Sequence, residues 1–244
     1  MNKIFVLTLF PEAVMGVLSG SIIGNAIKNG IVDIQCIQIR DYTQNRQMQV
    51  DDYPYGGGMG MLLMADPLYL AWKAAADQCK HPHTILMSAQ GQPYAQHAAR
   101  RLSLERELIF VCGHYEGVDQ RFIDECVDEE ISLGDFVLTG GEIAALAVID
   151  SVCRLLPGVL ADESCYIDES HWAGTLEYPH YTRPEVWHDK RVPDVLLSGH
   201  HENIRKWRRA KSLRSTRDKR PDLFEKLPLS AEDKKLLADE KYDQ

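Results

Sequence analysis

Short apolar, β-branched runs alternate with segments of helical periodicity over the first part of the chain. The runs have the length and composition of buried β-strands, and they cover residues 3–10, 32–39, 83–89 and 107–113. The helical segments cover residues 19–29, 65–79, 93–105 and 142–158, and Pro157 with Gly158 stops the last of them. Strands that alternate with helices predict an α/β fold with a mostly parallel sheet covered on both faces.

The pattern changes after Gly158. Residues 160–175 are polar and acidic with few secondary-structure signals, and helical periodicity returns from about Ser198 with many Lys and Arg residues. We therefore predict an α/β domain over residues 1–159, an interdomain linker over residues 160–175 and a helical domain over residues 176–244.

Composition favours a cytoplasmic protein that does not enter a membrane. The apolar run at residues 4–10 is followed at once by Pro11 without a small-residue cleavage site, which indicates a first strand and not a signal peptide. No apolar stretch approaches the ~18 residues that a membrane span needs. The six cysteines are scattered without a C-x-x-C pair, which is typical of reduced thiols in the cytosol.

The net charge of -9 argues at first against a nucleic-acid partner, but the charge is unevenly distributed. Residues 114–150 carry ten acidic side chains and one arginine. Residues 201–220 carry nine basic side chains and two acidic ones, with Trp207 and Leu213 at helical spacing. Such a run is often only a solvated face, but a basic helix with apolar anchors can also follow a phosphate backbone.

Glycine-rich loops mark a candidate ligand site. The segment DYPYGGGMGM at 52–61 matches neither the Walker A loop nor the dinucleotide fingerprint, because Met61 and Leu63 stand where those motifs need glycine. Two further glycine-containing loops, 112–121 and 129–142, follow predicted strands or lead into the long helix. Because glycine lets the backbone approach a ligand closely, we predict a site at the carboxyl ends of the strands that is built largely from peptide groups.

Five motifs together carry a resemblance to a known family. YGGGMGM, GHYEGVDQR, ISLGDFVLTGGE, PHYTRP and LLSGHH with IRKWR occur in collinear order over nearly the whole chain. The chain resembles the bacterial tRNA (guanine-N1)-methyltransferase (TrmD) family of the SPOUT superfamily. The resemblance implies a SPOUT-type α/β fold, with a mostly parallel sheet that contains a deep trefoil knot, followed by a small all-α C-terminal domain. It also implies S-adenosylmethionine as the methyl donor.

The resemblance places cofactor-binding residues in three loops. One of them, at Ser88 to Gly91, departs from the family because Ala89 stands where the family has proline, which predicts a somewhat looser loop. The implied cofactor-binding residues are Ser88, Gly113, Tyr115, Glu116, Leu133, Gly134, Asp135, Phe136, Val137, Leu138, Gly140 and Gly141. Glu116 also matches a residue associated with a magnesium requirement, and a simple contact with the cofactor or the backbone is the alternative.

The implied reaction transfers a methyl group to N1 of the guanine at tRNA position 37, beside the anticodon. Guanine N1 must lose its proton first, which a carboxylate can accept as general base. A guanidinium can stabilise the charge that builds on O6, and Arg154 matches the family's arginine. The family's aspartate aligns with Glu169, one methylene longer, so the base is Glu169 or the neighbouring Asp168.

The resemblance also implies partners: tRNA, and a second copy of the chain in a homodimer whose subunits complete each other's active sites. The residues expected to bind the RNA are Tyr55, Gly57, Gly58, Gly60, His180, Arg183, Arg205, Arg208, Arg209 and Arg214. Two alternatives remain open from the sequence: a non-catalytic RNA-binding protein, and a methyltransferase of the same fold that acts on ribosomal RNA or on a ribose hydroxyl.

Overall fold

The computed structural model describes residues 2–162, 164–239 and 241, and divides them into two compact units on either side of residue 163. Each unit is described by itself. The division falls near the beginning of the segment predicted as a linker, so most of that segment belongs to the second unit.

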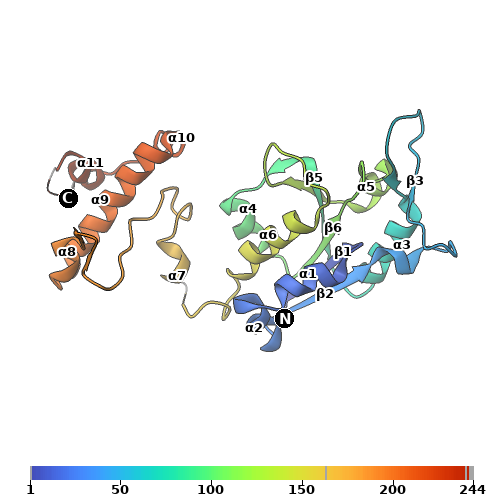
Figure 1. Cartoon of the computed structure of the whole chain (residues 1–244), viewed down its shortest axis with the longest axis horizontal. Coiled ribbons are helices and arrows are strands. Elements are labelled where there is room, and N and C mark those ends of the chain that lie inside the picture. Colours follow the sequence, from blue (N-terminus) through green and yellow to red (C-terminus); the bar gives the residue numbers. More distant parts are fainter. Residues whose placement is uncertain (1, 163, 240, 242–244) are drawn as a thin grey trace. The chain divides into compact units, whose positions relative to one another are not determined.

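The first unit is built on a five-stranded sheet in which every neighbouring pair is parallel (Figure 1). The strand order is β2-β1-β6-β5-β7, so the central strand β6 pairs with β1, which lies far from it in sequence. The strands are β1 (Asn2–Thr8), β2 (Val32–Gln38), β5 (His83–Pro93), β6 (Glu107–Cys112) and β7 (Glu129–Ser132). The predicted mixed fold with a parallel sheet is confirmed, while the knot stays a prediction.

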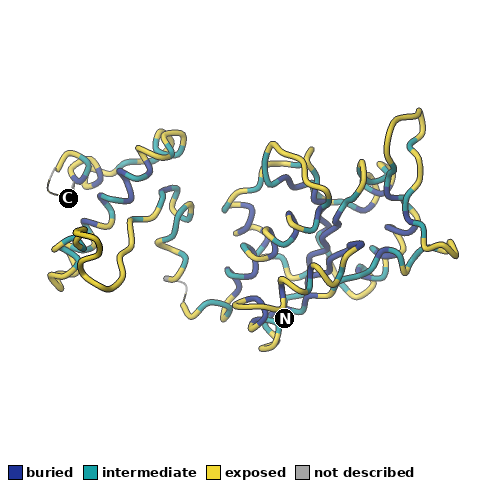
Figure 2. Tube along the Cα trace, in the orientation of Figure 1, coloured by how far each residue is buried: buried dark blue, intermediate teal, exposed yellow. Residues whose placement is uncertain are grey.

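Side chains that alternate along β1 pack into two different cores, one on each face of the sheet. Ile4 and Val6 belong to a cluster with residues of α1 (Pro11–Leu18), α2 (Ser21–Lys28) and α6 (Glu142–Cys153). Phe5 and Leu7 belong to the opposite cluster, with residues of α3 (Ala65–Ala76) and α5 (Gln120–Cys126). Figure 2 shows the central strands as the most buried part of the unit. This two-sided burial explains why these strands have continuous apolar sequences.

The helices expected at 19–29, 65–79, 93–105 and 142–158 are present but shorter, as α2, α3, α4 (Gln96–Leu102) and α6. The chain also forms α1 and α5, which the pattern analysis did not predict, together with a 3-10 turn η1 (Ile39–Tyr42) and a short pair of strands, β3 (Asp51–Asp52) and β4 (Leu62–Leu63). Residues 129–132, which we expected in a loop, form β7. Glu129 in this strand forms a bidentate ion pair with Arg101, which explains how an acidic segment can join the sheet.

The second unit is mainly helical around α9 (His201–Lys219), against which α10 (Pro221–Phe224) and α11 (Ala231–Ala238) pack. Its small core contains Trp207 and Ala210 from α9 and Leu236 from α11. The unit also contains α7 (Ser164–Ile167), α8 (Asp194–Leu197) and a hairpin of β8 (Val186–Trp187) with β9 (Lys190–Arg191). Because of this short hairpin, the expectation of an all-α domain is incomplete. The turn of the hairpin consists of His188 and Asp189, which both have positive φ.

Candidate active site

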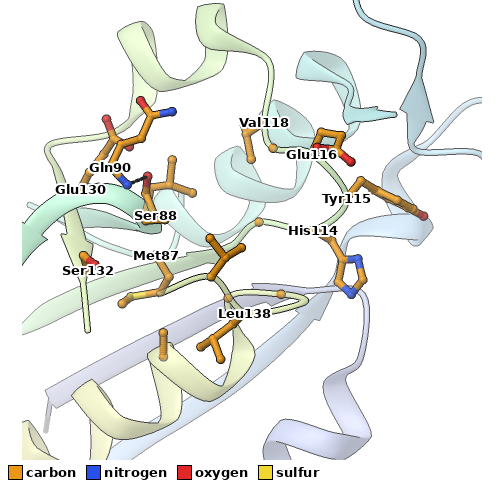
Figure 3. Close-up of a pocket in the computed structure, with 18 of the residues that line it drawn as sticks. Met87, Ser88, Gln90, His114, Tyr115, Glu116, Val118, Glu130, Ser132 and Leu138 are labelled. Carbon is orange, nitrogen blue, oxygen red and sulfur yellow. Dashed lines mark hydrogen bonds between the residues drawn. The ribbon is translucent and has the colours of Figure 1, made fainter. Parts of the chain in front are cut away.

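A cavity of about 390 Å³ opens at the carboxyl ends of the central strands of the first unit (Figure 3). Its walls come from the loops that follow β6 and β7 and from an interruption within β5. In Figure 3, Met87, Ser88 and Gln90 lie on one side, and His114, Tyr115 and Glu116 lie on the other. Ligands of parallel sheets bind at this edge, so the cavity lies where the sequence analysis placed a site.

The wall from β5 is an arch in the strand. Pairing with β7 stops at Met87 and resumes at Gln92, and both of these residues face Ile131, so the four residues between them bulge out of the ladder. Gly91 returns the chain to the sheet so closely that an added Cβ would lie 2.5 Å from the carbonyl carbon of Glu130. The arch therefore depends on a residue without a side chain at position 91.

The wall from residues 133–141 closes down on the end of β6. The N–H of Gly141 donates a hydrogen bond to the carbonyl of Gly113 at 2.9 Å. A Cβ at Gly141 would lie 2.8 Å from Cα of Cys112, so backbone meets backbone there. The next residue, Glu142, begins α6 and accepts a hydrogen bond from the buried Thr8 hydroxyl at 2.7 Å, which ties the helix to the end of β1.

The third wall, residues 113–117, is bonded to the glycine-rich loop. The N–H of Glu116 donates to the carbonyl of Met61 at 3.0 Å, and the N–H of Leu63 donates to the carbonyl of Gly117 at 2.9 Å. Tyr115 adopts a left-handed conformation with φ of +60°, which turns its ring to the cavity rim. The glycine-rich loop and the cavity therefore share one hydrogen-bonded framework.

The charge of the lining indicates the kind of ligand that fits. Among the described residues, the lining includes the carboxylates of Glu116 and Glu130 but no lysine or arginine. A phosphate-rich ligand would lack its usual cationic partners here, whereas a ligand with net positive charge is compatible.

Burial raises the pKa of the Cys112 thiol well above its usual value, so this residue beneath the cavity is not an activated nucleophile.

The structure brings most of the predicted cofactor residues together. Those that line the cavity are Ser88, Gly113, Tyr115, Glu116, Leu133, Phe136, Val137, Leu138, Gly140 and Gly141. Gly134 and Asp135 belong to the same loop but do not line it. Gly134 has φ of +157° and turns the chain after Ser132, whose hydroxyl accepts a hydrogen bond from the Gly134 N–H at 3.2 Å.

The predicted cofactor residues did not include several that line the cavity, among them Glu130, Ser132 and His114, although His114 lies within the expected loop from Gly113 to Glu116. His114 adjoined a predicted residue, and its ring lies 5.3 Å from that of Phe10. Glu130 and Ser132 belong to β7, which was expected to be a loop. Ile131, which is buried in the sheet core, is the single apolar residue of this EEIS segment and was too weak a signal for a strand.

Arg154 does not line this cavity. It follows the last residue of α6, whereas the cavity lies at the first residue, and the helix rises about 18 Å between Glu142 and Arg154. Within a single chain, the predicted catalytic arginine is therefore separated from the predicted cofactor loops.

The two candidate bases, Asp168 and Glu169, lie in the second unit and line a separate cavity of about 630 Å³. Arg205, Arg208 and Arg209 of α9 line the same cavity. The carboxylates and three of the predicted RNA-binding arginines are thus neighbours within one unit.

Most of the predicted RNA-binding arginines on α9 have internal partners. Arg205 pairs with Glu202 and Glu232, each at 3.0 Å, and hydrogen bonds from Arg205 and Lys206 lower the pKa of Glu202 to about 2. Arg209 pairs with Asp233 of α11 at 2.7 Å. Glu232 and Asp233, which lie outside residues 201–220, thus offset part of the positive charge that the sequence shows for this segment.

Arg214 is only 8% exposed, and its Nη2 donates hydrogen bonds to the carbonyls of Leu236, Leu237 and Asp239 at the end of α11. The structure thus gives Arg214 a role in holding α11 against α9. Its expected contact with RNA stays a prediction.

The remaining predicted substrate residues are accessible. Tyr55 is fully exposed at the tip of the glycine-rich loop, and Gly57, Gly58 and Gly60 all have positive φ. His180 and Arg183 are exposed on the segment that precedes β8. Within the described part of the chain, no group of three or more His, Cys, Asp or Glu side chains forms a metal site, and no helix is long and apolar enough to cross a bilayer.

Comparison with known proteins matches the chain to one family over almost its full length. The sequence model of the family described as tRNA (Guanine-1)-methyltransferase TrmD matches residues 2–226. A protein of Clostridium perfringens strain SM101 is 56% identical over 235 residues, which cover 96% of this chain and 98% of that protein. A protein of Ruminiclostridium cellulolyticum is 54% identical over 227 residues, covering 93% and 97%. A protein of Clostridium tetani is 50% identical over 238 residues, covering 98% of each. All three are named tRNA (guanine-N(1)-)-methyltransferase.

Proposed function

The chain belongs to the tRNA (guanine-1)-methyltransferase TrmD family, and from this membership we propose that it methylates N1 of guanine in tRNA, at position 37 beside the anticodon. The observation that carries the proposal is the peptide-lined cavity at the ends of β5, β6 and β7. Its lining contains the three loops that this family is expected to use for its methyl donor.

The cavity suits S-adenosylmethionine in size, charge and surface. A volume of about 390 Å³ lies in the range of small-molecule sites, and carboxylates without lysine or arginine accommodate a donor of net positive charge. When bound, this cofactor supplies an already activated methyl group. Gly113, Gly140 and Gly141 leave backbone groups accessible in the lining, so peptide N–H and C=O groups can bind the adenine and ribose.

The chain's own residues supply the proton transfer and the charge stabilisation. Glu169 or Asp168 accepts the N1 proton of guanine, which makes N1 nucleophilic. Arg154 stabilises the negative charge that builds on O6. Alignment of N1 with the methyl group then supplies much of the remaining rate increase.

These roles require a second copy of the chain. Because Arg154 lies at the far end of α6 from the cavity of its own chain, another subunit must bring the arginine and the donor together. We therefore assign the enzyme a homodimer in which each active site is completed across the interface. We infer a cytoplasmic location for this dimer from its proposed tRNA substrate.

The proposed magnesium ion has one candidate protein ligand, Glu116, whose carboxylate lies at the cavity rim. A single carboxylate is compatible with Mg²⁺, which usually keeps several water ligands and uses one or two protein carboxylates. Its place in the reaction would be to balance charge near the deprotonated guanine.

The decisive experiment is methylation of an unmodified tRNA transcript with guanine or adenine at position 37. We expect methyl transfer only to the guanine transcript, with 1-methylguanine identified by mass after digestion. A modified ribose, or a methylated ribosomal RNA fragment, would instead support an enzyme of the same fold with another target. Binding of tRNA without any transfer would support a non-catalytic RNA-binding protein.

A further inference from the structure

The second unit contains a groove of about 1160 Å³ that the proposed reaction does not use. It lies between the segment 178–185 and the helices α8 and α9. Its lining combines aromatic rings, an apolar floor and two guanidinium groups: Tyr178, His180, Tyr181, Arg183, Leu196, Leu197, Ile204 and Arg208.

Three flat groups in this groove contact one another: the Arg208 guanidinium lies over the Tyr178 ring, and the His180 ring packs against Tyr178 at an angle of 41°. Cζ of Arg208 lies 4.8 Å from the centroid of the Tyr178 ring, and the centroid of the His180 ring lies 4.6 Å from that of Tyr178. Tyr181 is half exposed nearby, with its ring 6.3 Å from the buried ring of Trp207. Aromatic rings and guanidinium planes are the surfaces on which proteins stack unpaired bases.

The guanidinium groups of the groove can bind an anionic ligand. Among the described residues, neither Arg183 nor Arg208 forms an ion pair, which separates Arg208 from the paired Arg205 and Arg209 on the same helix. One carboxylate, Glu185, also lines the groove, and Glu177 precedes the lining residue Tyr178 in sequence. Glu185 pairs with Arg191 at 2.8 Å, and Glu177 lies 3.7 Å from Nε2 of His180.

We propose that this groove binds one unpaired nucleotide of the RNA substrate, with its base on the Tyr178–Arg208 stack and its phosphate beside Arg183. The identification of the ligand as RNA rests on the proposed function, whereas the inference of an unpaired nucleotide rests on the residues that line the groove. A duplex keeps its bases stacked on one another and cannot use the aromatic faces. An acidic peptide would pair with the guanidinium groups but would leave the rings unused.

The test compares variants of the full-length protein in tRNA binding, measured at one fixed salt concentration. Loss of one stacked base contact should weaken binding by roughly 5- to 100-fold, so we expect this loss for Tyr178→Leu and for Arg208→Gln. Tyr178→Phe keeps the ring and should bind as the unmodified protein does. Arg217→Gln is the matched control, because it removes the same charge from α9 at a residue that already pairs with Asp218.

The nucleotide is located by removing its base. Transcripts with an abasic site at each loop position other than the target guanine are combined with Tyr178→Leu, and one position should lose affinity in the unmodified protein but lose nothing further in the variant. If every position loses affinity equally in both proteins, or if Arg217→Gln weakens binding as much as Arg208→Gln, the groove does not bind a base. Because Tyr178 packs against the small core of the second unit, thermal unfolding of each variant is measured too, and Arg208→Gln carries the test if Tyr178→Leu unfolds. Full methylation with unchanged binding in all variants would overturn this inference alone, whereas no methylation by the unmodified enzyme would overturn the proposed function.

Discussion

Gly60 and Glu116 touch across two loops that are distant in sequence: a Cβ at position 60 would lie 2.7 Å from Oε1 of Glu116. The contact joins the glycine-rich loop, where we place the RNA, to the rim of the cavity, where we place the methyl donor. A change at either residue should therefore affect binding at both.

Replacement of Gly60 by alanine should displace the Glu116 carboxylate and weaken donor binding by about tenfold, a loss of about 1.4 kcal/mol. Titration calorimetry with S-adenosylhomocysteine measures the effect. Gly56→Ala is the control, because Gly56 has nearly the same φ (+87° against +89°) but no atom within 4 Å of the added Cβ. Equal losses in the two variants would mean that backbone strain, not the Glu116 contact, is responsible.

Replacement of Gly141 by alanine should reduce both stability and donor binding. The added Cβ would meet Cα of Cys112 and N of Gly113, which are backbone atoms at the end of β6 and cannot move aside. Forced overpacking of this kind typically costs about 1–3 kcal/mol, which denaturant unfolding resolves. Gly16→Ala, in α1 with open space around its Cβ, should leave stability unchanged or slightly higher. A Gly141→Ala protein as stable as the Gly16→Ala protein would show that the loop adapts.

Single-turnover methylation of tRNA should identify the general base. Removal of the true base should slow methyl transfer by roughly 10²- to 10⁴-fold, and we expect this loss in Glu169→Ala, with a smaller one in Asp168→Ala. The reverse order would assign the role to Asp168. Equal and small losses in both variants would indicate a base elsewhere in the chain.

Complementation should reveal whether the active site is shared between subunits. A chain with both Asp168→Ala and Glu169→Ala is co-purified with a chain that carries Gly141→Ala, and the mixed dimer is compared with each parent. If the base and the cavity come from different subunits, the mixed dimer contains one intact site and its activity exceeds that of either parent. Inactive mixed dimers would place both parts in the same subunit.

Low pH should destabilise the fold of the second unit, because Asp233 becomes protonated. Its hydrogen bond with Arg209 lowers the pKa of Asp233 from 3.8 to about 2. Because the folded pKa lies below the unfolded one, the pair stabilises the fold fully above about pH 4 and loses this contribution as the pH falls toward 2. We expect Asp233→Asn to lose roughly 1–2 kcal/mol at neutral pH and to flatten the acid limb of the unfolding free energy.

Asp222 supplies the control for that titration. Its pKa is also lowered to about 2, by Arg220, but both side chains of the pair are exposed and therefore screened by solvent and salt. Asp222→Asn should follow the unmodified protein across the acid range. If the two variants behave alike, burial of the Arg209–Asp233 pair does not matter.

The strands and the cavity could be predicted because their signals are local. The runs at residues 83–89 and 107–113 contain the continuous apolar stretches 85–87 and 108–112, and the glycines at 113, 140 and 141 indicated a close approach of the backbone. The loop at Ser88 to Gly91 was expected only from the family resemblance; its form as an arch within β5 was not predicted, because it depends on Gly91 meeting the backbone of Glu130 from another strand. Strand β7 was missed because only Ile131 among its four residues is apolar, and its Glu129 needs Arg101 as a partner.

The role of the basic helix was only partly predictable for the same reason. A count of charges cannot distinguish Arg209, whose partner Asp233 lies on α11, from Arg208, which stacks on Tyr178. Nor could it show that the Arg214 side chain bonds to the end of α11. Such partners are set by tertiary packing, and only the folded unit reveals them.

The arch between Met87 and Gln92 has a consequence for the dynamics of the empty enzyme. The peptide groups of the arch do not take part in the regular hydrogen bonding between β5 and β7. This stretch should therefore open more readily than the strand segments on either side. A bound nucleoside would supply hydrogen-bond acceptors to these amides and so make local opening of the arch less frequent. We therefore expect amide deuterium uptake at residues 88–91 to slow sharply when the donor binds, while uptake at residues 84–86 hardly changes. Exchange in this irregular part of β5 would thus indicate whether the donor site is occupied.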